Sequence, residues 1–230
     1  MRNVLLSSAA ALMLMAAPQL ASAQAAASAP APAPSSETQL STPTTASDGS
    51  AVAAARAAYV AGFASTSNLE AGRSYGVPTI GTAAHSFTLL HDTEEDAFRA
   101  QLATLGDSTT LLVDTYDIAE AIRLGVELTE GRLGAIRLDS GDLAIVARQA
   151  RDLLDDLGAT HTKIMVTSDL DEWQIAALQG APVDGYGVGT ALVTGSGHPT
   201  CGFVYKLVAR ADSDAPDAHM TPVAKKSKGK

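Results

Sequence analysis

Short apolar runs alternate with amphipathic stretches through the middle of the chain. The runs are VPTI (77–80), TLLV (110–113), GAIR (134–137), KIMVT (163–167) and DGYGV (184–188). They recur roughly every 21 to 33 residues, the spacing of strand–helix units in a parallel sheet. The pattern predicts an α/β domain with repeated parallel strands.

Helix signals fall between these runs. Thr93 with Asp96 is typical of a helix start, and Gly106 of a helix end. Ser140 is expected to cap the longest helix, which carries one apolar stripe and ends before Gly158. These signals support the α/β interpretation.

A third helix is expected later in the chain. Ser168 and Asp171 predict its start, and Gly180 its end. Trp173 falls on the apolar side of this helix and is expected in the core.

The two ends of the chain differ from the middle. Residues 1–23 combine Arg2, an apolar run and the small residues Ala21-Ser22-Ala23, which predicts a signal peptide, with an uncleaved anchor as the alternative. Residues 24–50 are rich in Ala, Pro, Ser and Thr and predict a disordered linker. The globular part is expected over 51–211 and a flexible basic tail over 212–230.

The composition of the chain excludes some classes of function. The 230 residues carry a net charge of −9, which argues against nucleic-acid binding. The lone Cys201 excludes a disulfide scaffold within the chain, and a buried, inert thiol is expected. The five histidines show no metal-ligand spacing, so no metal site is predicted.

Polar residues follow almost every apolar run. His85 comes after the first run, Asp114 directly after the second, and Arg137 and Asp139 at the end of the third. Carboxyl ends of parallel strands build active sites in α/β folds, although Asp and Ser also cap helices. Arg137 and Asp139 alternate and face one side, where they would bind a carboxylate, phosphate or ribose, or form an internal ion pair. We therefore expect an active site at this edge.

The last run ends in a glycine-rich turn. Gly187, Gly189 and Thr190 suit phosphate binding because glycines let backbone N–H groups approach an anion. A tight structural turn is the alternative.

Several segments together resemble nicotinate phosphoribosyltransferase. They are GFASTSNLEAGRSYGVPTIGTAAHSF, LLVDTYD, IRLDSGDL, SDLDEW and GYGVGTALVTGSGHPTCGFVYKLV, and they lie in order between Ala53 and Arg210. The resemblance implies the central and late part of a type II phosphoribosyltransferase barrel, a TIM-like α/β fold. It implies the synthesis of nicotinate mononucleotide from nicotinate and phosphoribosyl pyrophosphate, coupled to ATP hydrolysis.

The resemblance also implies roles for individual residues. His85 matches the histidine that this family phosphorylates from ATP, and Asp114 the acid that orients its imidazole. Arg137 and Asp139 match residues that contact the pyridine and the ribose or phosphate groups. Gly187, Gly189 and Thr190 match the phosphate-binding turn, and Mg²⁺ is expected to bind together with the phosphates of the substrates.

Ser67 bears on the choice of substrate. Related nicotinamide enzymes resemble this segment but have Asp at this position, and an Asp would repel a carboxylate. A neutral hydroxyl that can donate a hydrogen bond favours nicotinate.

The family resemblance also implies where the protein is located and how it assembles. The family is cytoplasmic, whereas the predicted signal peptide indicates export, and no membrane association is expected after its cleavage. A homo-oligomer is expected because family sites are completed by a second subunit. An inactive fragment, or an exported module that binds phosphate and pyridine without turnover, is the alternative function.

Overall fold

The computed structural model describes residues 3–5, 14–16, 49–194, 206–211, 213, 215 and 217–226. The chain forms two compact units. The first comprises Met1–Gly81 and Lys163–Pro199, and the second Thr82–Thr162 and Thr200–Lys230. Among the described residues, no helix is long and apolar enough to cross a membrane.

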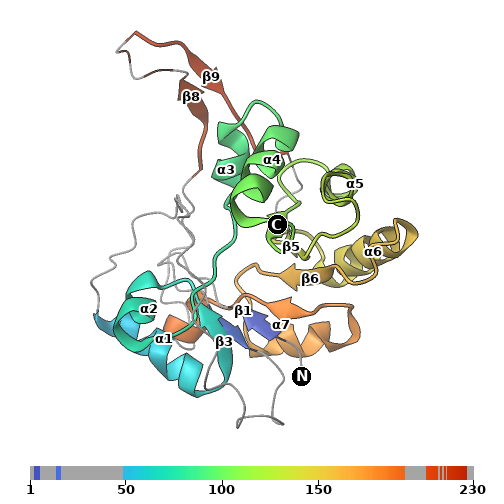
Figure 1. Cartoon of the computed structure of the whole chain (residues 1–230). Helices are drawn as coiled ribbons and strands as arrows, with labels where there is room; N and C mark the ends of the chain where they lie inside the picture. The colour runs from blue at the N-terminus through green and yellow to red at the C-terminus, as the bar shows by residue number, and fades with distance from the viewer. Residues whose placement is uncertain are drawn as a thin grey trace. The chain divides into compact units, whose positions relative to one another are not determined.

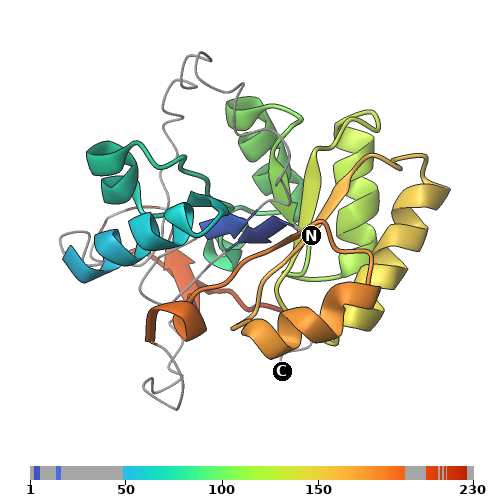
Figure 2. The same ribbon diagram turned by 90° about the horizontal axis from the view of Figure 1, so that it is seen from below.

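The second unit is built on two parallel strand–helix steps (Figure 1). Strand β4 (Thr110–Leu112) leads into α5 (Ile118–Leu128), and β5 (Ala135–Leu138) into α6 (Leu143–Asp156). The two strands pair in parallel, with Leu111 opposite Ile136. Helices α5 and α6 lie side by side next to these strands (Figure 2).

Two further helices precede these steps. Helix α3 (His85–Leu90) is short, and α4 (Glu94–Leu105) begins where the Thr93 hydroxyl accepts from the Asp96 N–H, 3.0 Å away. Gly106 ends α4 with a positive φ of 75°. The helix predicted between Thr93 and Gly106 is confirmed.

Burial explains why these elements form. The strand residues Leu111, Leu112, Ile136 and Leu138 are almost completely buried, as is Leu154 on the inner side of α6. A continuous apolar strand covered by helices gains about 25 cal/mol for each Å² of apolar surface removed from water. This packing fixes the carboxyl ends of β4 and β5 beside each other.

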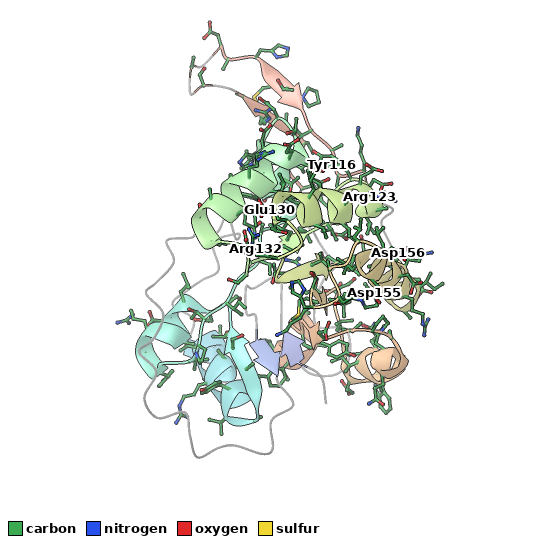
Figure 3. The ribbon with its side chains drawn as sticks, turned by 45° about the vertical axis from the view of Figure 1, so that its right-hand side comes forward. Tyr116, Arg123, Glu130, Arg132, Asp155 and Asp156 are labelled. Atoms are coloured by element: carbon green, nitrogen blue, oxygen red, sulfur yellow. The ribbon has the colours of Figure 1, made fainter. Side chains whose placement is uncertain are left out.

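The outer surface of this unit is charged. Figure 3 shows Arg123, Glu130, Arg132, Asp155 and Asp156 on and around α5 and α6. Arg132 donates to Glu130 at 2.8 Å and to Asp107 at 2.9 Å, and all three side chains are exposed. Exposed pairs of this kind contribute little to stability.

The last described part of the chain is a hairpin and an extended segment. Strands β8 (Ala209–Ala211) and β9 (Met220–Pro222) pair antiparallel, and Arg210 forms an ion pair with Asp92. The Lys226 N–H then donates to the Thr115 carbonyl at 3.0 Å. The predicted flexible tail stays a prediction, and within it the structure describes 220–226 as β9 and an extended segment that is hydrogen-bonded to the unit.

The first unit contains the other strands, β1 (Asn3–Leu5), β2 (Leu14–Ala16), β3 (Phe63–Thr66), β6 (Lys163–Val166) and β7 (Gly185–Tyr186). They lie in the order β3-β2-β1-β7-β6, and β6 and β7 are parallel. Its helices are α1 (Gly49–Val60), α2 (Leu69–Tyr75), α7 (Glu172–Ala177), the 3-10 helix η1 (Leu178–Gly180) and α8 (Thr190–Thr194).

Most of the N-terminal predictions lie outside the described residues. Within the predicted signal peptide only Asn3–Leu5 and Leu14–Ala16 are described, as β1 and β2. The signal peptide stays a prediction. The linker prediction is not described over residues 24–48, and α1 begins at Gly49, inside its predicted end. Cys201 also lies outside the described residues.

The structure confirms the α/β class with parallel strand–helix units and corrects details. Four apolar runs form β4, β5, β6 and β7, whereas the run at 77–80 contributes only a single parallel bridge between Thr79 and Thr66. Asp142 caps α6 in place of Ser140. Asp171 caps α7, and Ser168 lies three residues before this cap with a φ of 116°.

Trp173 does not lie in the core. Its side chain is 76% exposed on α7, a helix with no buried residue, so the predicted apolar side of this helix is wrong.

Candidate active site

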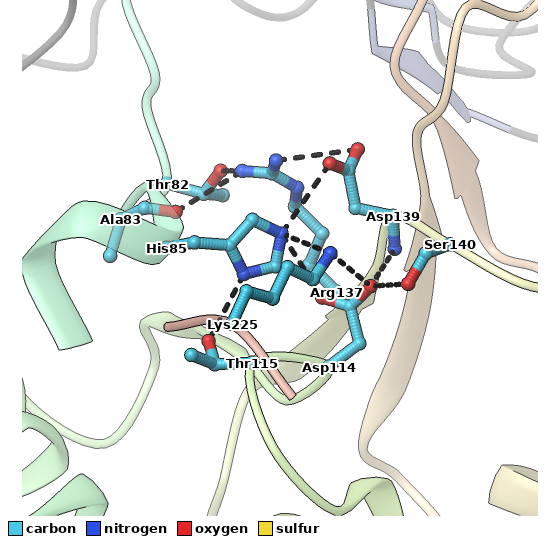
Figure 4. A network of polar contacts seen from close by, with 9 residues as sticks. All are labelled: Thr82, Ala83, His85, Asp114, Thr115, Arg137, Asp139, Ser140 and Lys225. Atoms are coloured by element: carbon cyan, nitrogen blue, oxygen red, sulfur yellow. Dashed lines mark hydrogen bonds and ion pairs between the residues drawn. The ribbon is translucent and has the colours of Figure 1, made fainter. Parts of the chain in front are cut away.

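Four segments of the second unit converge on one polar cluster, and one of them is the segment after β9 that carries Lys225 (Figure 4). His85 begins α3, Asp114 and Thr115 follow β4, and Arg137 and Asp139 lie at the end of β5. Parallel pairing places the ends of β4 and β5 at the same edge, as the sequence pattern predicted. The four residues expected from the strand ends therefore lie together.

The imidazole of His85 is held at both ring nitrogens. Its Nδ1 lies 3.1 Å from the Thr115 hydroxyl, and its Nε2 lies 2.9 Å from the Lys225 ammonium. Two carboxylate oxygens are slightly farther from Nε2, Asp114 Oδ1 at 3.6 Å and Asp139 Oδ2 at 3.7 Å. The ring is mostly buried, so these neighbours fix its orientation.

Asp114 is the buried centre of the cluster and has no exposed surface. Its Oδ2 accepts from the Ser140 hydroxyl and from the Asp139 N–H at 3.2 Å, and it lies 3.6 Å from the Lys225 ammonium. Its Oδ1 is buried and accepts no hydrogen bond from the described residues. Ser140 thus bonds this carboxylate instead of capping a helix.

Arg137 and Asp139 form the internal ion pair that the sequence left open. The Arg137 Nη2 lies 3.4 Å from Asp139 Oδ1, and its Nη1 donates to the Thr82 hydroxyl and, at 3.2 Å, to the Ala83 carbonyl. The guanidinium is buried, whereas the Asp139 carboxylate is partly exposed. Arg137 therefore joins the segment before His85 to the end of β5.

Sequence reasoning missed Thr115 and Lys225 as site residues. Thr115 lies beside Asp114 in the polar segment after β4, and its position next to a strand end was the available signal. Lys225 was assigned to a flexible tail, and nothing in the local sequence indicates that its ammonium reaches His85.

Burial and nearby negative charge raise the pKa of a carboxyl group close to the cluster. Burial, together with the charges of Asp117 and Asp114, raises the pKa of Glu94 to about 7. Burial and Glu94 also raise the pKa of Tyr116, and Arg210 opposes this effect. Glu94 is therefore half protonated near neutral pH.

The other four predicted site residues belong to the first unit. Ser67 follows β3 and is partly buried, and Thr190 begins α8. Gly187 and Gly189 are buried, and the Gly187 N–H donates to the Val166 carbonyl at 2.7 Å. The Gly187 amide thus belongs to the β6–β7 pairing, which matches the structural-turn interpretation at this one glycine.

Comparison with known proteins gives matches in sequence. No protein-family model matches the chain. Nicotinate phosphoribosyltransferase pncB1 of Mycobacterium tuberculosis (strain ATCC 25618 / H37Rv) is 61% identical over 166 residues, which are 69% of this chain and 37% of that protein. Nicotinate phosphoribosyltransferase of Bacillus subtilis (strain 168) is 44% identical over 164 residues, 67% of this chain and 33% of that protein. The chain spans about a third of the length of these relatives.

Solved structures agree with this fold. Nicotinate-nucleotide pyrophosphorylase from Pyrococcus furiosus has a TM-score of 0.56 and 26% identity, over 60% of this chain and 38% of that chain. Nicotinate phosphoribosyltransferase from Porphyromonas gingivalis has a TM-score of 0.55 and 21% identity, over 71% of this chain and 47% of that chain. These neighbours define the class of fold, an α/β fold with parallel strand–helix units. Over the matched region the chain belongs with the nicotinate phosphoribosyltransferases, which confirms the resemblance in its sequence.

Proposed function

We propose that this chain carries the catalytic core of a nicotinate phosphoribosyltransferase. The reaction transfers the phosphoribosyl group of phosphoribosyl pyrophosphate to nicotinate, which forms nicotinate mononucleotide and releases pyrophosphate, and it is coupled to ATP hydrolysis in NAD salvage. The main support is the cluster around His85, which combines an oriented imidazole with two carboxylates and two cations. The identity of 61% to a relative of that name supports the same reaction.

His85 is the proposed acceptor of the γ-phosphoryl group of ATP. An imidazole suits this role because a neutral ring nitrogen carries a lone pair near pH 7. The Thr115 hydroxyl orients the ring through Nδ1, and the fully buried Asp114 lies on the Nε2 side. Asp114 is therefore proposed as the acid that stabilises the ring during phosphoryl transfer.

Arg137 and Asp139 are proposed to bind substrate. The partly exposed Asp139 carboxylate is suited to accept ribose hydroxyls, and Arg137 holds it in position and supplies positive charge for a carboxylate or phosphate. Ser67 is proposed to favour nicotinate over nicotinamide. Gly189 and Thr190 are proposed to bind phosphate, while Gly187, whose amide is already bonded, shapes the turn.

The carboxylates of the cluster fit a Mg²⁺ ion that binds together with the phosphate groups of a substrate. Mg²⁺ is usually held by one or two carboxylates together with substrate phosphates. The cluster supplies the carboxylates Asp114 and Asp139, of which only Asp139 is partly exposed. We assign Asp139 as the residue that contacts the ion or its water, and the ion would neutralise the pyrophosphate charge.

Assembly and location are part of the proposal. The family resemblance supports a homo-oligomer and a cytoplasmic location for an enzyme that uses ATP and phosphoribosyl pyrophosphate. The apolar run within residues 1–23 supports export instead. Fractionation of cells that express the full chain, with N-terminal sequencing, would decide between retention and cleavage.

Transfer of phosphate to His85 tests the proposal. The full chain is incubated with Mg²⁺ and ATP labelled in the γ-phosphate, and acid-labile, base-stable label on the protein is measured. Label is expected on the wild type and on the control His161→Gln, whose histidine is exposed, but not on His85→Gln. Equal labelling of the His85→Gln variant would refute the assignment.

A further inference from the structure

The Lys225 ammonium contacts both His85 and Asp114 in the cluster. Its ammonium lies 2.9 Å from His85 Nε2, and an ammonium group only donates hydrogen bonds. A protonated Nε2 would place two donors against each other. In this arrangement Nε2 is therefore the acceptor, which leaves Nδ1 to carry the proton and to donate to the Thr115 hydroxyl at 3.1 Å.

Two carboxylates favour the opposite arrangement, in which Nε2 of His85 carries the proton. Asp114 Oδ1 and Asp139 Oδ2 lie 3.6 and 3.7 Å from Nε2. Asp114 Oδ1 is buried and accepts no hydrogen bond from the described residues, so a proton on Nε2 would give it a donor. The Thr115 hydroxyl can donate as well as accept, and so it fits both arrangements.

We infer that Lys225 is a positioning residue that decides which nitrogen of His85 carries the proton. While its ammonium lies on Nε2, that lone pair is engaged and Nδ1 is protonated, so neither nitrogen presents a free lone pair. When the ammonium leaves, Nε2 carries the proton as a hydrogen-bond donor toward Asp114, and the Nδ1 lone pair is engaged only by the Thr115 hydroxyl, whose proton can rotate away. A phosphate-bearing substrate would draw the ammonium away by its negative charge. This inference rests on the proposed role of His85, but its test needs no turnover.

The chain supplies a matched control beside Lys225. Lys226 carries the same charge, its side chain is exposed and lies 5.9 Å over the Tyr116 ring, and its backbone N–H bonds Thr115. Replacing the Lys226 side chain keeps that backbone bond and removes one positive charge. An effect on the His85 tautomer that depends only on the loss of one positive charge would therefore be the same in the Lys225 and Lys226 variants.

The test is nitrogen NMR of the histidine rings in the full chain. Protein labelled with ¹⁵N-histidine is studied at pH 8, above the usual imidazole pKa of about 6.5. His85→Gln identifies the His85 signals among the five histidines. The wild type and Lys226→Met are expected to carry the proton on Nδ1, Lys225→Met on Nε2, and Lys225→Arg, which keeps a cationic donor, on Nδ1.

Two outcomes would overturn the inference. A wild-type ring with its proton on Nε2 would do so by itself and needs no variant, so the inference stays testable even where Lys225→Met does not fold. A folded Lys225→Met protein with the wild-type tautomer would also do so. Failure of the proposed function has a different signature, since wild-type protein would then lack phosphate transfer whatever its tautomer.

Discussion

Asp114→Asn tests whether a buried negative charge organises the cluster. The substitution keeps the size of the side chain and one acceptor oxygen, and it removes the charge. Asp114 has no exposed surface, accepts from Ser140 and from the Asp139 N–H, and lies 3.6 Å from the Lys225 ammonium. All three neighbours interact with the carboxylate more strongly than with a neutral amide.

The expected loss of stability in Asp114→Asn follows from these contacts. A hydrogen bond to a charged group contributes about 1.5–3 kcal/mol and a neutral one about 0.5–1.5, so two bonds lose about 2 kcal/mol together. The partly hydrated Lys225 adds about 1 kcal/mol or less. Relief of the repulsion on Glu94 opposes these losses. We expect the free energy of unfolding to fall by about 2–3 kcal/mol.

The assay is urea denaturation of the full chain at pH 7, followed by far-ultraviolet circular dichroism. The control is Asp152→Asn, which removes the same charge from an exposed position of α6 and is expected to change stability by less than about 0.5 kcal/mol. Equal stability of Asp114→Asn and wild type would refute the reasoning, because the cluster would then not depend on this charge.

Three further predictions concern Glu94, Gly134 and Ser67. The pKa of Glu94 is raised to about 7 in the folded chain, so the free energy of unfolding falls as pH rises from about 4.5 to 7. In urea melts, Glu94→Gln should be as stable as wild type at pH 4.5 and more stable by about 1–2 kcal/mol at pH 8, after allowance for solvent screening. Gly134→Ala places a Cβ against the Ser108 carbonyl oxygen and should cost about 2 kcal/mol in the same assay, whereas Gly180→Ala, with open space around it, should cost less than 1. Ser67→Asp should lower kcat/KM for nicotinate relative to nicotinamide, and an unchanged ratio would remove Ser67 from the specificity argument.

Local sequence signals predicted that the polar residues at the strand ends would lie together. Asp114 directly follows one apolar run and Asp139 lies two residues after the next, and parallel pairing of those runs necessarily brings the strand ends together. Arg137 and Asp139 alternate along an extended segment, and their predicted proximity is confirmed as an ion pair. Short-range geometry was enough for these residues.

Features that depend on distant contacts could not be read from the sequence. Lys225 reaches His85 from 140 residues away, through a hairpin whose strands are only three residues each. Ser140 has the chemistry of a helix cap, but the buried carboxylate of Asp114 competes for its hydroxyl. Asp142 caps the helix in its place, and no local rule ranks the two.

Trp173 shows the limit of periodicity in short helices. Helix α7 has six residues, fewer than two turns, so an apolar side is poorly defined by sequence. The pattern therefore did not predict that the Trp173 side chain is exposed.

Formation of nicotinate mononucleotide tests the central proposal most directly. The full chain is mixed with nicotinate, phosphoribosyl pyrophosphate, Mg²⁺ and ATP, and the product is measured by mass spectrometry beside His85→Ala and a control without enzyme. We expect product from the wild type that increases with ATP, and from His85→Ala only a low rate that ATP does not change. Absence of product from wild-type protein that is folded by circular dichroism would contradict the proposed activity.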